Sequence, residues 1–353
     1  MKQKLLSTAK KVEEQIRNYR FQSVHKHQAK KILKSIELVK GRTAAQLIKL
    51  SDEYAKDVLG WKGYAPWLYV YSAIADTFHE GWIPDNYYGS IVVPVIQGDY
   101  GMVSGMKSLS NILYKEDVFP DIGYFINGLF LSKNYKIISE LEFKDLLFKN
   151  SETVVFKTDH SYQGKGVFFF TKTTFDPLKV KQLGNGVFQD YIDQHGFFDN
   201  LTPDSVATLR ITTVITPSGI ASVRACYLRL GRKADTHVRS GTHIRIPIAL
   251  DTGELGTLGY LPDWRTIENH PDTLVEFANK SIPCFKKCME TATRLHKQIP
   301  FVQAIGWDMT VDQNEDVRVM EWNGAFNDIK FSEATQGPCF SDLGWEYLWK
   351  KKK

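Results

Sequence analysis

The feature that most limits the fold of this chain is a series of short apolar runs, each closed by a turn signal, that begins near residue 120. Runs rich in β-branched and aromatic residues between Gly, Asn, Asp and Pro are typical of β-strands. Turn signals at 217–219 (Pro-Ser-Gly) and 251–253 (Asp-Thr-Gly) separate neighbouring runs. The strands predicted on this basis cover residues 122–126, 129–131, 153–157, 166–171, 187–190, 208–216, 220–230, 243–250, 306–310 and 317–322.

These strands do not alternate regularly with helices, so a parallel, doubly wound sheet is excluded. One longer helix is predicted at 272–298, between Pro271 and Pro300, with a kink or a break at Pro283. Hydrophobic residues make up 43% of the 353 positions and charged residues 24%, which is the composition of a globular protein with a sizeable core. The sequence therefore predicts an α+β protein with two or three lobes.

The first hundred residues have a helical character. Apolar side chains recur at helical spacing along 2–40, and Gly41 is a natural end for such a helix. The stripe consists of Leu5, Ala9, Val12, Ile16 and Tyr19 and resumes at Ala29, Ile32, Ile36 and Val39. Lys and Arg cover the other faces, so this is either a solvated helix packed on the body or a docking surface for an acidic partner or an anionic membrane. The aromatic-rich segment 51–82 is predicted to be helical, and 91–96 to be a short buried strand.

The net charge of +5 is distributed unevenly along the chain. Residues 1–42 hold 12 Lys and Arg against three Glu and so carry +9, and the last four lysines add +4, which leaves −8 for the rest. A nucleic-acid binder presents basic charge along a groove, interleaved with stacking aromatic residues. Because the basic charge here lies at the two ends, nucleic acid is not an expected partner.

Cysteine content and hydrophobicity bear on the compartment. Four cysteines are too few for a disulfide framework, and the one close pair, Cys284 and Cys288, lacks the His or Cys partners of a zinc site. The Lys-rich start is followed by no apolar run of signal-peptide length, and no stretch of 18 uncharged apolar residues occurs. We expect a soluble cytoplasmic protein, peripheral to the inner face of a membrane if its basic helix docks there.

A first motif with chemical potential lies at 154–170. A strand ends in Lys157, a polar loop containing Gly164 and Gly166 follows, and an apolar strand returns. Such a loop lays backbone N–H groups over phosphates while the lysine neutralises their charge. It is not a Walker A loop, because Gly rather than Ser or Thr follows Lys165 and no helix comes next. Taken alone, the same residues also fit an ordinary hairpin.

A second motif combines Asp308, a polar turn at 312–316, and Glu321 and Asn323 on the returning strand. Residues two apart on a strand share a face, so these side chains are expected to lie together while Trp322 points to the packed side. Two carboxylates and an amide oxygen suit Mg²⁺ that bridges nucleotide phosphates. An acidic solvent-facing hairpin is the alternative, and the apolar flanks argue against it. Between the motifs, 186–195 reads as a strand that ends in polar residues, which suits a hinge between two lobes.

In this order and spacing the motifs resemble those of the ATP-grasp superfamily, and most closely its branch associated with sugar transfer and cell-surface polysaccharide synthesis. The resemblance runs from about Lys107 to Asn327. It implies an ATP-grasp fold, in which two α+β lobes clasp ATP. A helix-rich N-terminal region precedes this fold in the sequence. The implied division is 1–100 for the helical region and 101–345 for the ATP-grasp domain, with a lid-bearing lobe at about 120–188 and a metal-bearing lobe at about 189–335.

The resemblance also implies roles for individual residues, with ATP and Mg²⁺ as cofactors. Lys107 and Lys157 match the lysines that hold the α- and β-phosphates, and Gln189 matches the side chain that reads the adenine amino edge. The lid over the nucleotide corresponds to Ser161, Gln163, Gly164, Lys165 and Gly166. The backbone of Asp190 and Ile192 completes the adenine edge, and Asp193, His195 or Asp199 binds the ribose. The Mg²⁺ ligands correspond to Asp308, Glu321 and Asn323.

One departure from the family pattern concerns an arginine. Dipeptide-forming relatives have an arginine two residues before the first metal carboxylate, where this chain has Gly306. Guanidinium groups bind carboxylates and phosphates at two points and stabilise a transferring phosphoryl group. The middle strands and their loops supply candidate replacements: Arg210, Arg224, Arg229, Arg232, Arg239 and Arg245. We expect Arg210, Arg229 and Arg245 to be catalytic, and surface ion pairs are the alternative role.

These expectations combine into an ATP-dependent carboxylate–amine ligase that forms an amide through an acylphosphate. The sugar-transfer resemblance points to a carboxylated sugar and an amino acid or other amine as substrates, in polysaccharide or capsule biosynthesis. A phosphotransferase that acts on a sugar hydroxyl is one alternative. A non-catalytic nucleotide-binding scaffold is another, although a scaffold needs no metal ligands.

Overall fold

The computed structural model describes residues 2–161, 164–233, 237–238 and 241–351, with side chains described from Val12 onward. The predicted site residues Gln163 and Arg239 lie outside the described residues. The chain divides into two compact units. We call Met1–Gly98, Asp263–Arg265 and Asp328–Lys353 the helical unit, and Asp99–Pro262 with Thr266–Asn327 the sheet unit.

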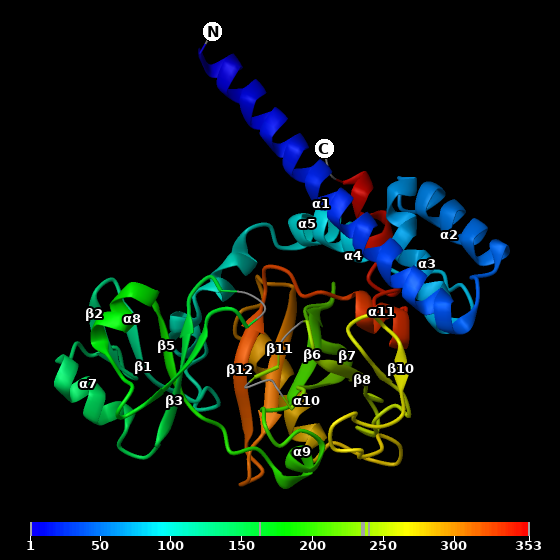
Figure 1. The fold of residues 1–353 in the computed structure, drawn as a ribbon. Coiled ribbons are helices and arrows are strands. Elements are labelled where there is room, and N and C mark those ends of the chain that lie inside the picture. Colours follow the sequence, from blue (N-terminus) through cyan, green and yellow to red (C-terminus); the bar gives the residue numbers. More distant parts are fainter. Residues whose placement is uncertain (1, 162–163, 234–236, 239–240, 352–353) are drawn as a thin grey trace. The chain divides into compact units, whose positions relative to one another are not determined.

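The helical unit is built on α1 (Lys2–Lys40), which packs against α3 (Ala65–Ala75) in Figure 1. The packed face of α1 consists of Gln22, His25, Ala29, Ile32 and Ile36. Trp67 donates its indole N–H to Nδ1 of His25 at 3.1 Å, and burial lowers the pKa of His25 to about 4. This unit also contains α2 (Ala45–Asp57), α4 (Asp85–Tyr87), α5 (Val93–Ile96), α11 (Lys330–Gln336) and η5 (Trp345–Lys350).

The predicted strand at 91–96 is wrong. This segment is helical, with a π-helical turn η2 (Tyr88–Val92) that runs directly into α5. Pro94 lies in the first turn of α5, directly after the π-helical turn. A short apolar run fits a buried helix as well as a buried strand, so the pattern could not separate them.

The sheet unit contains a five-stranded antiparallel sheet, the lid sheet, with the order β2-β1-β5-β3-β4. Its strands are β1 (Asp121–Ile126), β2 (Leu129–Ser132), β3 (Thr153–Thr158), β4 (Val167–Thr171) and β5 (Gly186–Asp190). One face is covered by α7 (Glu140–Leu147) and α8 (Pro177–Leu183), whose Phe143 and Val180 share a core cluster with Phe156 and Phe188. Alternation therefore turns Val155, Lys157 and Gln189 to the other face.

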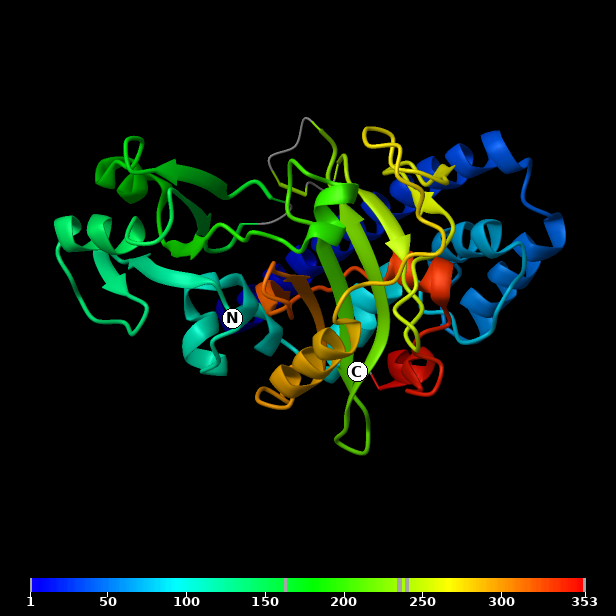
Figure 2. The same cartoon turned by 90° about the horizontal axis from the view of Figure 1, so that it is seen from below.

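The second sheet of this unit, the central sheet, has seven antiparallel strands in the order β10-β9-β8-β7-β6-β11-β12. The strands are β6 (Thr208–Ile215), β7 (Ala221–Leu230), β8 (Ile244–Pro247), β9 (Gly259–Tyr260), β10 (Thr266–Ile267), β11 (Ala304–Val311) and β12 (Val317–Asn323). Helix α10 (Phe285–His296) lies against β6, β7 and β11 in Figure 2 and closes the main core. The short helices α6 (Ser110–Tyr114) and α9 (Gly196–Leu201) complete the unit.

Of the helix predicted at 272–298, only the second half is helical in the structure. Helix α10 begins at Phe285, directly after Pro283 and a left-handed Cys284 with φ +52°. The segment before Pro283 forms turns and isolated bridges, such as Ser281 with Glu254. The proline therefore breaks the helix rather than bending it, as the missing N–H and the ring clash require.

In the part of the chain that the structure describes, none of the helices combines the length and apolar character that crossing a membrane requires.

Candidate active site

The polar face of the central sheet brings the three predicted metal ligands together. Asp308 of β11 lies opposite Glu321 of β12, and Asn323 lies opposite Gly306, so all three side chains belong to one face. Trp307 and Trp322 alternate to the other face and are buried in the main core. A bulge on β12 beside Asp308 changes the register between these residues and the rest of the strand.

Asp308 is held by two arginines from neighbouring strands. Its Oδ1 accepts from Arg210 Nε at 2.6 Å and lies 2.5 Å from Arg229 Nη2, and its Oδ2 accepts from Arg210 Nη2 at 3.2 Å. Cross-strand pairing places Arg210 of β6 directly opposite Asp308. Burial alone raises the pKa of Asp308, but the two guanidinium groups outweigh it and lower the pKa to about 2. The carboxylate is therefore charged at any physiological pH.

The row of arginines continues across the sheet. Arg245 of β8 lies opposite Arg229 of β7, and its Nη2 donates to the carbonyl oxygen of Leu261 at 3.1 Å. Of the other candidates, Arg232 forms a two-point ion pair with Asp272 at 2.7 and 2.8 Å near the surface. The structure therefore gathers the three predicted catalytic arginines on the face that carries Asp308.

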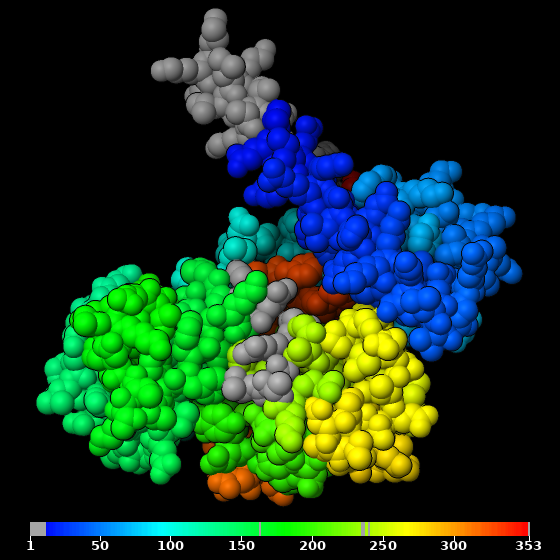
Figure 3. All heavy atoms as spheres, in the orientation of Figure 1, coloured from blue at the N-terminus to red at the C-terminus, as the bar shows by residue number. Residues whose placement is uncertain are grey.

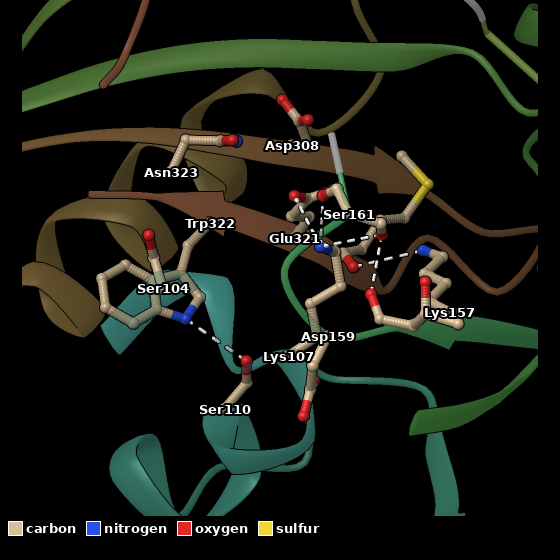
Figure 4. A network of polar contacts seen from close by, with 12 residues as sticks. Ser104, Lys107, Ser110, Lys157, Asp159, Ser161, Asp308, Glu321, Trp322 and Asn323 are labelled. Atoms are coloured by element: carbon tan, nitrogen blue, oxygen red, sulfur yellow. Dashed lines mark hydrogen bonds and ion pairs between the residues drawn. The ribbon is translucent and has the colours of Figure 1, made fainter. Parts of the chain in front are cut away.

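Two lysines from separate segments contact the end of β12, one at Glu321 and the other at the preceding Met320 (Figure 4). Lys107 lies in a 3₁₀ turn, η4 (Lys107–Leu109), and its Nζ is 3.5 Å from Glu321 Oε1 and 2.8 Å from the carbonyl oxygen of Ser161. Lys157 is the penultimate residue of β3 and donates to the carbonyl oxygen of Met320 at 3.2 Å. Burial lowers the pKa of Lys157, and the charge of Glu321 opposes that shift. Both predicted phosphate lysines thus lie beside a predicted metal ligand.

The loop after β3 is tied to the segment that carries Lys107. Asp159 accepts from the backbone N–H of Ser108 at 3.0 Å and from its hydroxyl at 2.7 Å. The backbone N–H of His160 donates to the carbonyl oxygen of Gly105 at 2.6 Å. Gly164, with φ +77°, adopts a left-handed conformation, while Lys165 is exposed. The sequence interpretation missed Asp159, although its position directly after the end of β3 was a usable signal.

The hinge strand β5 leads into a pocket of about 310 Å³. Its lining includes the predicted base- and ribose-binding residues Asp190, Ile192 and Asp193, together with Asp121. Of the three ribose candidates, His195 caps α9 by accepting from the N–H of Phe197, and Asp199 accepts from Gln194. Asp193 is the candidate of these three that lines the pocket.

Comparison with known families identifies this architecture. Residues 177–341 match the model of the family described as sugar-transfer associated ATP-grasp. This part of the chain, just under half of its length, is similar to that family. The matched region includes the hinge, the three arginines and the Asp308 motif, whereas Lys107 and Lys157 precede it. Together with the two antiparallel sheets, the match confirms the predicted α+β class and ATP-grasp fold behind a helix-rich N-terminal region.

Solved structures similar to this chain include ligases and synthetases. One is N5-carboxyaminoimidazole ribonucleotide synthetase from Thermotoga maritima, with 13% identity and a TM-score of 0.34. The alignment covers 63% of this chain and 42% of the synthetase. D-alanyl-alanine synthetase A from Vibrio cholerae has 12% identity and a TM-score of 0.41, with 72% and 67% covered. L-amino acid ligase from Bacillus licheniformis has 10% identity and a TM-score of 0.41, with 70% and 48% covered. The chain thus spans less than half of the length of the Thermotoga maritima synthetase and of the Bacillus licheniformis ligase. None of the curated proteins matches the chain.

The glycine at position 306 of the ATP-grasp region has a structural reason. A Cβ atom there would lie 1.7 Å from Oδ1 of the buried Asn327 and 3.2 Å from Nη1 of Arg210. The same Nη1 donates to the carbonyl oxygen of Asn327 at 3.2 Å. The space that a side chain at 306 would need is therefore filled, and Arg210 brings its guanidinium group to that place from the next strand. This supports Arg210 as the replacement for the missing arginine.

The residues of the polar face fit one hard cation such as Mg²⁺. Glu321, Asn323 and Asp308 offer oxygen atoms, which Mg²⁺ prefers. An ionised carboxylate has about four acceptor positions, and three arginine N–H groups occupy Asp308, so one position at Oδ2 remains. Within the described ranges no group of three or more His, Cys, Asp and Glu side chains that could hold a metal occurs, and the candidate set accordingly includes an amide.

Proposed function

We propose that the protein is an ATP-dependent carboxylate–amine ligase that joins an amino acid or other amine to a carboxylated sugar. A carboxylate oxygen of the sugar attacks the γ-phosphorus of ATP, which gives an acylphosphate and ADP. The amine then attacks the acyl carbon, inorganic phosphate leaves, and the amine gives up a proton. The family description, sugar-transfer associated, supports the sugar as substrate class and a role in cell-surface polysaccharide or capsule biosynthesis.

The observation that carries the proposal is the buried row of cationic side chains around Asp308. Arg210 and Arg229 contact this carboxylate, and Arg245 continues the row, which suits the binding of a substrate carboxylate beside a transferring phosphoryl group. Lys107 and Lys157 lie on the other side of Glu321, where the α- and β-phosphates would bind. The protein would act by positioning and charge neutralisation, with no covalent nucleophile.

The state of the site carboxylates favours a ligase over a phosphotransferase. Transfer to a hydroxyl needs a general base with a pKa near the working pH. Asp308, with a pKa of about 2 and two arginine partners, is a poor base, and Glu321, which lies 3.5 Å from Lys107, would be occupied as a metal ligand. A carboxylate substrate is already ionised and needs no base to attack. The Mg²⁺ held by Glu321, Asn323 and Asp308 would neutralise phosphate charge when bound.

The direct test supplies ATP and Mg²⁺ with pooled uronic-acid sugars and pooled amino acids. ADP and inorganic phosphate are expected only when both pools are present. Release of AMP, or phosphate on a hydroxyl, would rule out the proposed mechanism. Nucleotide binding without turnover on any carboxylate pool would favour the scaffold.

Removal of Glu321 should abolish metal-dependent nucleotide binding. At 100 times its dissociation constant, a ligand stabilises the folded state by about 2.7 kcal/mol, which raises the melting temperature by roughly 2–4 °C in a chain of this size. We expect this shift for wild-type protein with ATP and Mg²⁺, and its loss in Glu321→Ala. Glu276→Ala, an exposed carboxylate far along the chain, is the control and should keep the shift. An unchanged shift in Glu321→Ala would contradict the metal assignment.

We further propose that the protein is cytoplasmic and that the first half of α1 contacts an anionic membrane surface. Val12, Ile16 and Tyr19 are 48%, 48% and 75% exposed, and in Figure 3 the described part of this segment stands clear of its own unit. At about 100° per residue, their stripe lies roughly 130° around the helix from the packed stripe. Six Lys and Arg against two Glu in 2–20 complement anionic lipid.

Deletion of 2–20 tests this second proposal. Deletion through residue 40 would remove the packed Ala29, Ile32 and Ile36 and expose the core, so the shorter deletion is the informative one. We expect the shortened protein to lose binding to vesicles that contain anionic lipid, while its ATP affinity stays within about twofold, since no site residue is removed. Vesicles of neutral lipid are the control. Equal vesicle binding by both proteins would overturn the membrane contact, and capture by an acidic protein instead would reassign it.

A further inference from the structure

Gln189 of the hinge strand is held by a buried carboxylate. Asp121 and Gln189 are cross-strand neighbours on β1 and β5, and each is 4% exposed. Gln189 Nε2 donates to Asp121 Oδ1 at 2.9 Å, and the Tyr124 hydroxyl donates to Asp121 Oδ2 at 3.1 Å. Both side chains thus belong to the lid-sheet face that carries Lys157, and Asp121 lines the pocket beside Asp190 and Ile192.

This contact decides the orientation of the Gln189 amide. An ionised carboxylate only accepts hydrogen bonds, whereas an amide group has a donating nitrogen and an accepting oxygen. If the amide were turned over, two acceptor oxygens would face each other in a buried place, which is strongly unfavourable. The nitrogen therefore stays on Asp121. Among the residues that the structure describes, no donor contacts Gln189 Oε1, so this acceptor is available to a ligand.

We infer that Asp121 is the positioning residue for base specificity: it fixes Gln189 with its carbonyl oxygen available, so that the site accepts the 6-amino group of adenine and rejects the 6-oxo group of guanine. The inference rests on the proposed nucleotide site at this hinge and deepens it. An oxygen that faces the 6-position gains a hydrogen bond from adenine, but with guanine it meets another acceptor. Sites built on such a hydrogen bond discriminate strongly, because the wrong ligand leaves buried polar groups unmatched.

The test compares dissociation constants for ATP, GTP and purine riboside triphosphate, which lacks any group at position 6. Burial raises the pKa of Asp121 to about 6, so titrations at pH 8 keep the carboxylate ionised. In wild-type protein we expect purine riboside triphosphate to bind about tenfold more weakly than ATP, and GTP more weakly still. This part of the test needs no variant, so it holds even if a substitution in the buried pair prevents folding.

Asp121→Asn then removes the charge that fixes the amide while keeping the shape. Because either amide orientation becomes possible, we expect the GTP-to-ATP ratio of dissociation constants to fall about tenfold or more. Asp117→Asn, on the rim of the same pocket, makes the same charge change without contact to Gln189 and should leave the ratio unchanged. Tyr124→Phe, which removes one hydrogen bond from Asp121, should lower the ratio by less than Asp121→Asn does.

The outcomes separate this inference from the proposed function. ATP binding with an unchanged ratio in folded Asp121→Asn, or wild-type protein that binds purine riboside triphosphate as well as ATP, would overturn the role of Asp121 and leave the nucleotide site standing. Wild-type protein that binds none of the three nucleotides would overturn the nucleotide site itself. A GTP-to-ATP ratio of dissociation constants that falls about tenfold in Asp121→Asn and is unchanged in Asp117→Asn would support the inference.

Discussion

Asp308→Ala is expected to lower the free energy of unfolding by about 3–5 kcal/mol, because it leaves two buried guanidinium groups without their shared carboxylate. Asp308 is 7% exposed and Arg210 8%, so water cannot replace the lost charge without opening the sheet face. Equilibrium denaturation in urea measures this loss. Added inorganic triphosphate should restore part of the stability, because its negative charges take the place of the carboxylate among the arginines.

The matched control for this prediction is Asp316→Ala, in the turn that joins β11 to β12. Asp316 pairs with Lys287 at 2.9 Å, but both side chains are about half exposed, so the expected loss is below about 0.5 kcal/mol. If Asp308→Ala were no more destabilising than this surface variant, the buried ion-pair cluster would not exist as described.

Lys157→Met is expected to weaken ATP binding by about 10- to 100-fold while leaving the protein at least as stable as the wild type. The lysine is partly buried and burial lowers its pKa, so an apolar side chain of similar length removes a desolvation cost. The same change removes one charge-assisted contact to phosphate, which is worth about 1.5–3 kcal/mol. Calorimetric titration with ATP and Mg²⁺ measures the affinity, and thermal denaturation the stability.

Lys172→Met serves as its control, because Lys172 is exposed in the turn after β4. It should bind ATP as the wild type does. Equal ATP affinity in Lys157→Met and the wild type would remove Lys157 from the nucleotide site. Loss of stability together with affinity would instead show that Lys157 holds the two sheets of this unit together through its contact with Met320.

The sequence predicted β1 to β7 well because their signals are local, whereas the two-residue strands β9 and β10 were not predicted. Alternating apolar residues and Gly, Asn or Asp turns bound β1 to β7 closely, and Ser139 with Glu142 at the start of α7 forms a capping box that the sequence interpretation passed over. The errors fall where local signals are ambiguous. The run 91–96 fits a strand or a helix equally, and the helix predicted at 272–298 begins only after Pro283.

The candidate site could be predicted only as a set of residues, not as a network. Same-face placement of Glu321 and Asn323 follows from their spacing, but the pairing of Asp308 with Arg210 joins positions 98 apart and depends on the β6–β11 register. The contact of Asp121 with Gln189, 68 positions apart, depends in the same way on β1 pairing with β5. Strand order is a property of the whole sheet, so such partners are visible only in the structure.

The fate of a carboxylate oxygen tests the central claim most directly. Uronic-acid sugars labelled with oxygen-18 in the carboxylate are incubated with the protein, ATP, Mg²⁺ and the amine pool, and the released phosphate is analysed by mass spectrometry. The account predicts ADP and inorganic phosphate that carries one labelled oxygen, because the oxygen that attacks the γ-phosphorus leaves with the phosphate. Unlabelled phosphate, or release of AMP, would contradict it.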